Sequence, residues 1–187
     1  MKYLAGLLLI VACTAHAEGM LERERIEAFH TNLLSMMDID SQVDREAHIQ
    51  GTIENLFDFE RIARVSLGRS WRTLEPESQT EFRDLLCKTV IATYARRFSE
   101  NNGQTFTVHG AKTAKRGVVV ESSVNPANAE SVKLDYFFSD GKVFNVAADG
   151  VSDLSLRRAD YNSVLKSNGF EALMAHLQQQ LSALREG

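Results

Sequence analysis

The hydrophobic period of the chain changes twice, and this double change constrains the fold more than any other feature of the sequence. Up to about residue 98, apolar residues recur at intervals of three and four, as on one face of a helix. After Asn101-Asn102-Gly103 they alternate with polar residues, as in half-buried strands, and the helical period returns at about Ser155. The order helices, strands, helices predicts a single α+β domain with several helices packed on one face of a curved antiparallel sheet.

The alternating pattern occupies residues 104–109, 117–124, 131–138 and 143–148, so we predict a sheet of about four strands. The third segment is the clearest, because its apolar residues alternate with Lys133 and Asp135. Ser139-Asp140-Gly141-Lys142 is typical of a tight hairpin turn. The apolar face of the predicted sheet consists of Phe106, Val108, Val118, Val120, Val132, Leu134, Tyr136 and Phe138, and the return strand begins at Val143.

Amphipathic helices are predicted on both sides of the strands. Ser41 is expected to cap the second helix, and Asn168-Gly169 to break the last helical region into two. The residues that share the inward faces are Leu21, Ile26, Phe29, Leu33, Met36 and Met37; then Ile49, Ile53, Leu56 and Phe57; and finally Tyr161, Val164, Leu165, Leu173, Leu177, Leu181 and Leu184.

Residues 57–98 combine two further helix signals. Asp58 can cap a short helix with Ile62, Val65 and Leu67 facing inward, and Gly68 can end it in the left-handed conformation. Pro76 then fits the first turn of a second helix, where its missing N–H costs nothing. If this helix continues to residue 98 it spans roughly 33 Å, which is long enough to wall a cavity.

The first 17 residues have the features of a secretory signal peptide. Lys2 is followed by an apolar segment too short to span a membrane and by the small-x-small cleavage signal Ala15-His16-Ala17. We therefore predict a signal peptide over residues 1–17 and one exported domain over residues 18–187. An alternative is a lipoprotein box ending at Cys13, which would attach the protein to a membrane. The formal net charge of −4 argues against nucleic acid as a partner.

No catalytic motif is visible, so the sequence indicates a protein that is not an enzyme and that needs neither a metal nor a cofactor. His30, His48, His109 and His176 fall on different predicted elements and not at metal-ligand spacing. Cys87 lies beside the apolar stripe of the long helix, where a buried, inert thiol is expected rather than a nucleophile. Arginines at 61, 64, 69 and 72, and at 157 and 158, suit either a basic patch or a solvated helix face.

Two stretches in register resemble the Mla/toluene-tolerance family: FDFERIARVSLGRSWRTLEPESQTEF with the later Thr93-Tyr94, and Asp149-Gly150-Val151-Ser152 followed by Arg158, Tyr161 and Gly169. Proteins of this family of the MlaC type are periplasmic lipid carriers that work with an ABC transporter. The resemblance implies that the acyl chains of a phospholipid lie in an apolar cavity between the sheet and the helices. It also implies transfer between an outer-membrane lipoprotein-porin complex and an inner-membrane ABC transporter complex, with no cofactor and no chemistry.

The match has departures, and it leaves alternatives open. Gly141 and Asn145 stand where the family usually has tryptophan and aspartate, and Arg157-Arg158 where it has a Tyr-Arg pair. The run from Ala92 to Val108 is also similar to the hopanoid-associated branch of the superfamily, so the lipid species is open. A periplasmic chaperone or adaptor with a solid core is the alternative from another class.

From the resemblance and the predicted faces, we expect thirteen residues to line the lipid cavity. They lie on the long helix, on the residues before it and on the apolar face of the sheet: Leu67, Trp71, Val90, Tyr94, Phe98, Phe106, Val108, Val118, Val120, Leu134, Tyr136, Phe138 and Val143. A lipid with about thirty methylenes faces a barrier on the order of 20 kcal/mol to entering water. A protein that covers the chains would remove that barrier.

Overall fold

The computed structural model describes residues 9–186, with side chains from residue 19 onward. The predicted signal peptide therefore lies outside the described residues or, from residue 9, in a stretch described by its backbone alone. Cleavage after Ala17 and lipidation of Cys13 stay predictions. Among the described residues, no helix is long and apolar enough to cross a membrane.

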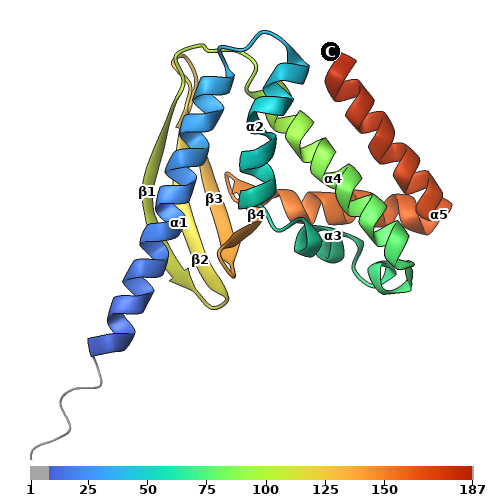
Figure 1. Ribbon diagram of the computed structural model, residues 1–187, viewed down its shortest axis with the longest axis horizontal. Helices are drawn as coiled ribbons and strands as arrows, with labels where there is room; N and C mark the ends of the chain where they lie inside the picture. The colour runs from blue at the N-terminus through green and yellow to red at the C-terminus, as the bar shows by residue number, and fades with distance from the viewer. Residues whose placement is uncertain (1–8, 187) are drawn as a thin grey trace, which may run out of the picture.

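Helices and strands follow the predicted order, and the α+β class is confirmed (Figure 1). An antiparallel sheet forms one layer, and helices pack on one of its faces. The elements are α1 (Leu9–Met36), α2 (Gln42–Leu56), α3 (Phe59–Leu67), the 3-10 helix η1 (Ser70–Thr73), α4 (Pro76–Arg97), β1 (Thr105–Ala114), β2 (Gly117–Asn125), β3 (Val132–Ser139), β4 (Lys142–Ala148), β5 (Val151–Ser152) and α5 (Asp153–Glu186).

The sheet is an antiparallel meander of five strands in the order β1-β2-β3-β4-β5. The strand beyond the predicted four is β5, which pairs Ser152 with Ala147 and is too short to show a period. The register shifts between Phe137 and Phe138, so the β3–β4 hairpin bends there.

Helix α1 covers the β1 and β2 side of the sheet (Figure 1). Phe29 is fully buried, and its ring lies 5.3 Å from that of Tyr94 and 6.3 Å from that of Tyr136. His30 stacks on Phe106 with 4.3 Å between ring centroids. Leu21 is a correction: it was expected to face inward, but its side chain is 55% exposed. The reason is that the inward face of α1 at this level is formed by Gly19, which lies against Ala111 of β1, and by the buried Glu22.

The local helix signals at Asp58, Ser41 and Pro76 act as the sequence predicts, whereas the conformation of Gly68 differs. The Asp58 carboxylate accepts a hydrogen bond from the Arg61 N–H at 2.9 Å, and the Ser41 hydroxyl accepts one from the Asp44 N–H at 3.4 Å. Pro76 occupies the first turn of α4. Gly68 follows α3 with φ 60° and ψ −120°, so its φ is positive but its ψ is not that of a left-handed helix.

Helix α5 bends at Gly169, where φ is 82° and the backbone is not helical. The predicted break is confirmed. The part before Gly169 starts at the sheet and crosses α4, and the part after it runs back alongside α4 (Figure 1). Leu173, Leu177 and Leu181 are buried there. Helix α1 therefore packs against β1 and β2 at one side of the sheet, whereas α2, α3 and α5 pack against β4 at the other.

Candidate functional site

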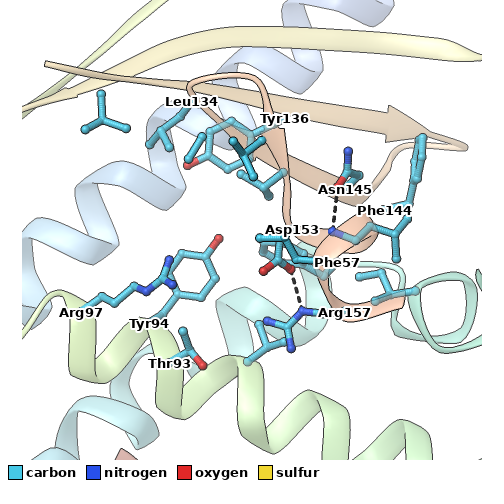
Figure 2. A pocket seen from close by; sticks show the side chains of 18 of the residues that line it. Phe57, Thr93, Tyr94, Arg97, Leu134, Tyr136, Phe144, Asn145, Asp153 and Arg157 are labelled. Atoms are coloured by element: carbon cyan, nitrogen blue, oxygen red, sulfur yellow. Dashed lines mark hydrogen bonds and ion pairs between the residues drawn. The ribbon is translucent and has the colours of Figure 1, made fainter. Parts of the chain in front are cut away.

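A cavity of about 330 Å³ lies between the β3–β4 side of the sheet, α4 and the first turns of α5 (Figure 2). Its walls are mainly apolar. They are formed by Phe57 and Ile62 beside α3; Val90, Thr93, Tyr94, Arg97 and Phe98 on and after α4; Val124, Val132, Leu134, Tyr136, Phe144, Asn145, Val146, Ala148 and Val151 on the sheet; and Asp153, Leu154, Leu156 and Arg157 on α5.

The floor of the cavity follows from strand register. Leu134 pairs with Ala148, and Tyr136 pairs with Val146, so these side chains leave one face of two neighbouring strands. Tyr94 rises from α4 and points its hydroxyl toward this floor (Figure 2).

Five of the predicted cavity residues line this space: Val90, Tyr94, Phe98, Leu134 and Tyr136. The other eight lie elsewhere. Phe106 and Val108 are on β1 beneath α1, while Val118, Val120, Phe138 and Val143 are buried in the core, as is Leu67. Trp71 packs edge-on against Phe82, with centroids 6.5 Å apart.

None of the other lining residues was among the thirteen predicted cavity residues. Val132 and Val146 had a usable signal, because they share the alternation of their strands with Leu134 and Tyr136. The polar lining residues Arg97, Asp153 and Arg157 had none, because only the tertiary fold brings α4 and α5 to one cavity.

Asn145 fixes the start of α5 against β4. Its side-chain oxygen accepts hydrogen bonds from the Ser152 hydroxyl at 2.9 Å and from the Leu154 N–H at 3.1 Å. The Ser152 oxygen in turn accepts the Ser155 N–H at 3.1 Å, which caps the helix. This network places Asp153 and Arg157 at the cavity wall.

Arg157 is held in place by two neighbours. Its Nε donates to Asp153 at 2.6 Å, and its Nη1 donates to the Tyr161 hydroxyl at 3.2 Å. Burial acts against the charge of Arg157, but Tyr161 and Asp153 outweigh it and hold the pKa of the guanidinium above its ordinary value. Arg157 is therefore a fixed positive charge in an apolar wall.

The aromatic part of the site is uncharged near neutral pH. Burial raises the pKa of both Tyr94 and Tyr136. Burial also lowers the pKa of His30 to about 4, although Glu27 acts in the opposite direction. His30 and the Tyr136 hydroxyl share a hydrogen bond of 3.1 Å. The hydroxyl of Tyr136 thus links this cavity residue to α1.

The cavity lining contains no pair of side chains suited to nucleophilic or acid–base catalysis. Cys87 is half-buried on α4, does not line the cavity, and has its pKa raised by burial to about 12. Within residues 19–186, no group of three His, Cys, Asp or Glu side chains could hold a metal ion. What the arrangement can do is hold an apolar ligand beside a few charges.

A family model described as MlaC protein matches residues 27–179 of the chain. Among solved structures, the fold is similar to that of the phospholipid-binding protein from Ralstonia solanacearum, determined in complex with a phospholipid. The TM-score is 0.76 and the identity 23%, over 88% of this chain and 99% of that one. At this identity the likeness shows a shared fold. A search among curated proteins finds no match.

Proposed function

The chain belongs to the MlaC family, and on this premise we propose that it is a periplasmic carrier that binds a phospholipid in the cavity between β3–β4 and α4–α5. The observation that carries the proposal is the cavity itself, because an apolar space of about 330 Å³ is left open beside a well-packed core. In an adaptor with a solid core, apolar side chains would fill such a space. The protein binds and transports, and it performs no reaction.

The apolar lining suits acyl chains. Leu134, Val146 and Ala148 on the sheet face Val90 and Phe98 from α4 across the cavity. Each methylene moved from water into such surroundings is worth about 0.8 kcal/mol, so even partial cover of two chains is strongly favourable. The fold is that of a protein solved with a phospholipid bound, which supports the same class of ligand here.

The cavity volume sets a condition on binding. About 330 Å³ lies at the lower end of the range for small-molecule pockets. A diacyl lipid with about thirty methylenes is larger than such a ligand. We therefore propose that a bound lipid either leaves part of its acyl chains outside this cavity or widens the cavity as it enters.

The proposed partners are an outer-membrane lipoprotein-porin complex and an inner-membrane ABC transporter complex. Transfer of phospholipid between them would help to maintain the lipid asymmetry of the outer membrane. This part of the proposal depends on the family and on the expected export of the chain.

The test is to purify the protein without detergent, extract it with organic solvent and identify the lipid by mass spectrometry. We expect diacyl phospholipid at close to one molecule per protein. Bound ligand stabilises the folded state by mass action, by about 2.7 kcal/mol at a hundredfold excess over the dissociation constant. For a chain of this size, delipidation should therefore lower Tm by roughly 5–10 °C.

Two results would count against the carrier. One is protein that extracts free of lipid and gains no stability from phospholipid vesicles, which would favour the adaptor alternative. The other is a polycyclic lipid in the extract, which would favour the hopanoid-associated alternative.

A further inference from the structure

The charged residues of the cavity lining are few and unbalanced. Arg97, Asp153 and Arg157 carry charge, and the remaining lining residues do not. Asp153 pairs with Arg157 at 2.6 Å, which leaves Arg97 as a surplus positive charge. An apolar cavity with one surplus cation is complementary to an apolar ligand with one negative charge.

Arg97 is free to meet such a charge. It is the last residue of α4 and is exposed, and it makes no hydrogen bond or ion pair with any other residue in the described part of the chain. Arg157, in contrast, is held by Asp153 and Tyr161, so it offers a fixed donor group. Figure 2 shows the side chains of both arginines beside the cavity, with Tyr94 between them in the view.

Tyr94 adds an uncharged donor. Its hydroxyl has no hydrogen-bond partner in the described part of the chain and points into the cavity (Figure 2). Asp153, Arg157 and Arg97 all act electrostatically on this phenol, which places the four groups within range of one another. A guanidinium with free N–H groups and a neighbouring hydroxyl form a typical set of donors for phosphate oxygens.

We infer that Arg97, with Tyr94 and Arg157, binds the phosphate group of the lipid at the cavity mouth, so that the site selects phospholipids over uncharged lipids with the same chains. The inference rests on the proposed carrier function and adds the group that is recognised. The shared chemistry is a phosphate monoanion, which could belong to a lipid headgroup or to free phosphate. The apolar lining of the same cavity favours the headgroup, because acyl chains gain free energy from contact with it and free phosphate does not.

The experiment compares wild type with Arg97→Gln and with a matched control, Arg96→Gln. Arg96 is the neighbouring exposed arginine in the last turn of α4, but it does not line the cavity. Both substitutions remove one charge from the same helix end, so they change the helix-dipole interaction alike. Delipidated proteins are equilibrated with vesicles that contain dioleoylphosphatidylglycerol and dioleoylglycerol, and the protein-bound lipids are measured by mass spectrometry.

We expect wild type and Arg96→Gln to hold phosphatidylglycerol in clear preference to diacylglycerol. In Arg97→Gln this preference should fall about tenfold, as for the loss of a hydrogen bond to a charged group. An equal preference in all three proteins would overturn the inference and leave the carrier function intact. A wild type that binds neither lipid would instead overturn the carrier function.

A second arm separates the two sources of phosphate. Inorganic phosphate is added to delipidated wild type and Arg97→Gln, and Tm is followed. The headgroup inference expects no difference between the two proteins. A saturable rise of Tm in wild type alone, without any preference for phosphatidylglycerol, would mean that the site takes a free anion and would overturn the headgroup assignment.

Discussion

Replacing Leu134 with arginine separates a lipid cavity from a solid core. Leu134 is half-buried on the cavity floor, whereas Phe29 is fully buried on the inward face of α1. Full burial of a leucine is worth about 1.5–3 kcal/mol, so Leu134→Arg should forfeit roughly 1 kcal/mol, and its guanidinium can extend into the open space. The variant should stay folded.

Phe29→Arg should behave differently. Truncating a buried phenylalanine costs about 3–5 kcal/mol, and an unpaired buried charge adds several kcal/mol more. The sum approaches or exceeds the 5–15 kcal/mol that holds a typical domain together. The ring of Phe29 contacts those of Phe57, Tyr94 and Tyr136, and none of these side chains carries a negative charge that could neutralise the new one. We expect this variant to be unfolded.

Lipid binding gives the second readout. In Leu134→Arg a charge would stand among the acyl chains at a cost of at least about 3 kcal/mol, which is more than a hundredfold in affinity. Circular dichroism and lipid extraction on both variants decide the matter, with Leu134→Met as the volume-conserving control that should keep both fold and lipid. Unfolding of Leu134→Arg would mean that this face is a solid core. A folded Leu134→Arg that still carries lipid would place the ligand elsewhere.

Three further predictions test other parts of the molecule. Burial raises the pKa of Cys87 to about 12, so iodoacetamide at pH 8 should label this thiol slowly in native protein and fully in urea. Cys87→Ser should keep its lipid. Rapid labelling of native protein would contradict the prediction. Burial lowers the pKa of His30 from 6.5 to about 4, so the unfolded chain binds more protons between these values. The free energy of unfolding should therefore be unaffected by His30 above pH 6.5 and should fall by about 3 kcal/mol as the pH approaches 4. Urea midpoints should show this fall in wild type. An equal fall in His30→Gln would refute the assignment. Gly117 has φ 119°, and a Cβ there would overlap the Phe138 carbonyl, so Gly117→Ala should cost about 3 kcal/mol or more in urea unfolding. Gly110→Ala is the control, since a Cβ there meets nothing within 4 Å, and equal losses in the two variants would contradict the steric argument.

The elements that could be predicted from the sequence are those fixed by local chemistry. Asp58 and Ser41 satisfy backbone N–H groups of their own helices, and Pro76 and Gly169 act on the turn in which they stand. Their effect does not depend on distant parts of the chain. Strand β5 escaped prediction for the opposite reason, because only its pairing with β4 defines it.

The site could be predicted only in part, because alternation tells which residues share a face and not what covers that face. Phe106 and Leu134 follow the same pattern on the same sheet. Phe106 stacks on His30 of α1 and does not line the cavity, whereas Leu134 lines it. The difference is the position of α1, which no local pattern encodes.

The boundary between core and cavity shows how the walls of the space are held in place. Tyr136 lies on that boundary, since it lines the cavity while its hydroxyl is bound to His30 of α1 and its ring meets Phe29. On the other side, Asn145 ties the first turn of α5 to β4, so this turn cannot slide into the gap. A cavity loses its lining contacts when it is empty, and a soft wall would close to regain them. Because both walls are anchored by hydrogen bonds outside the space, collapse would break those bonds. A carrier that must release its lipid and accept another needs such walls.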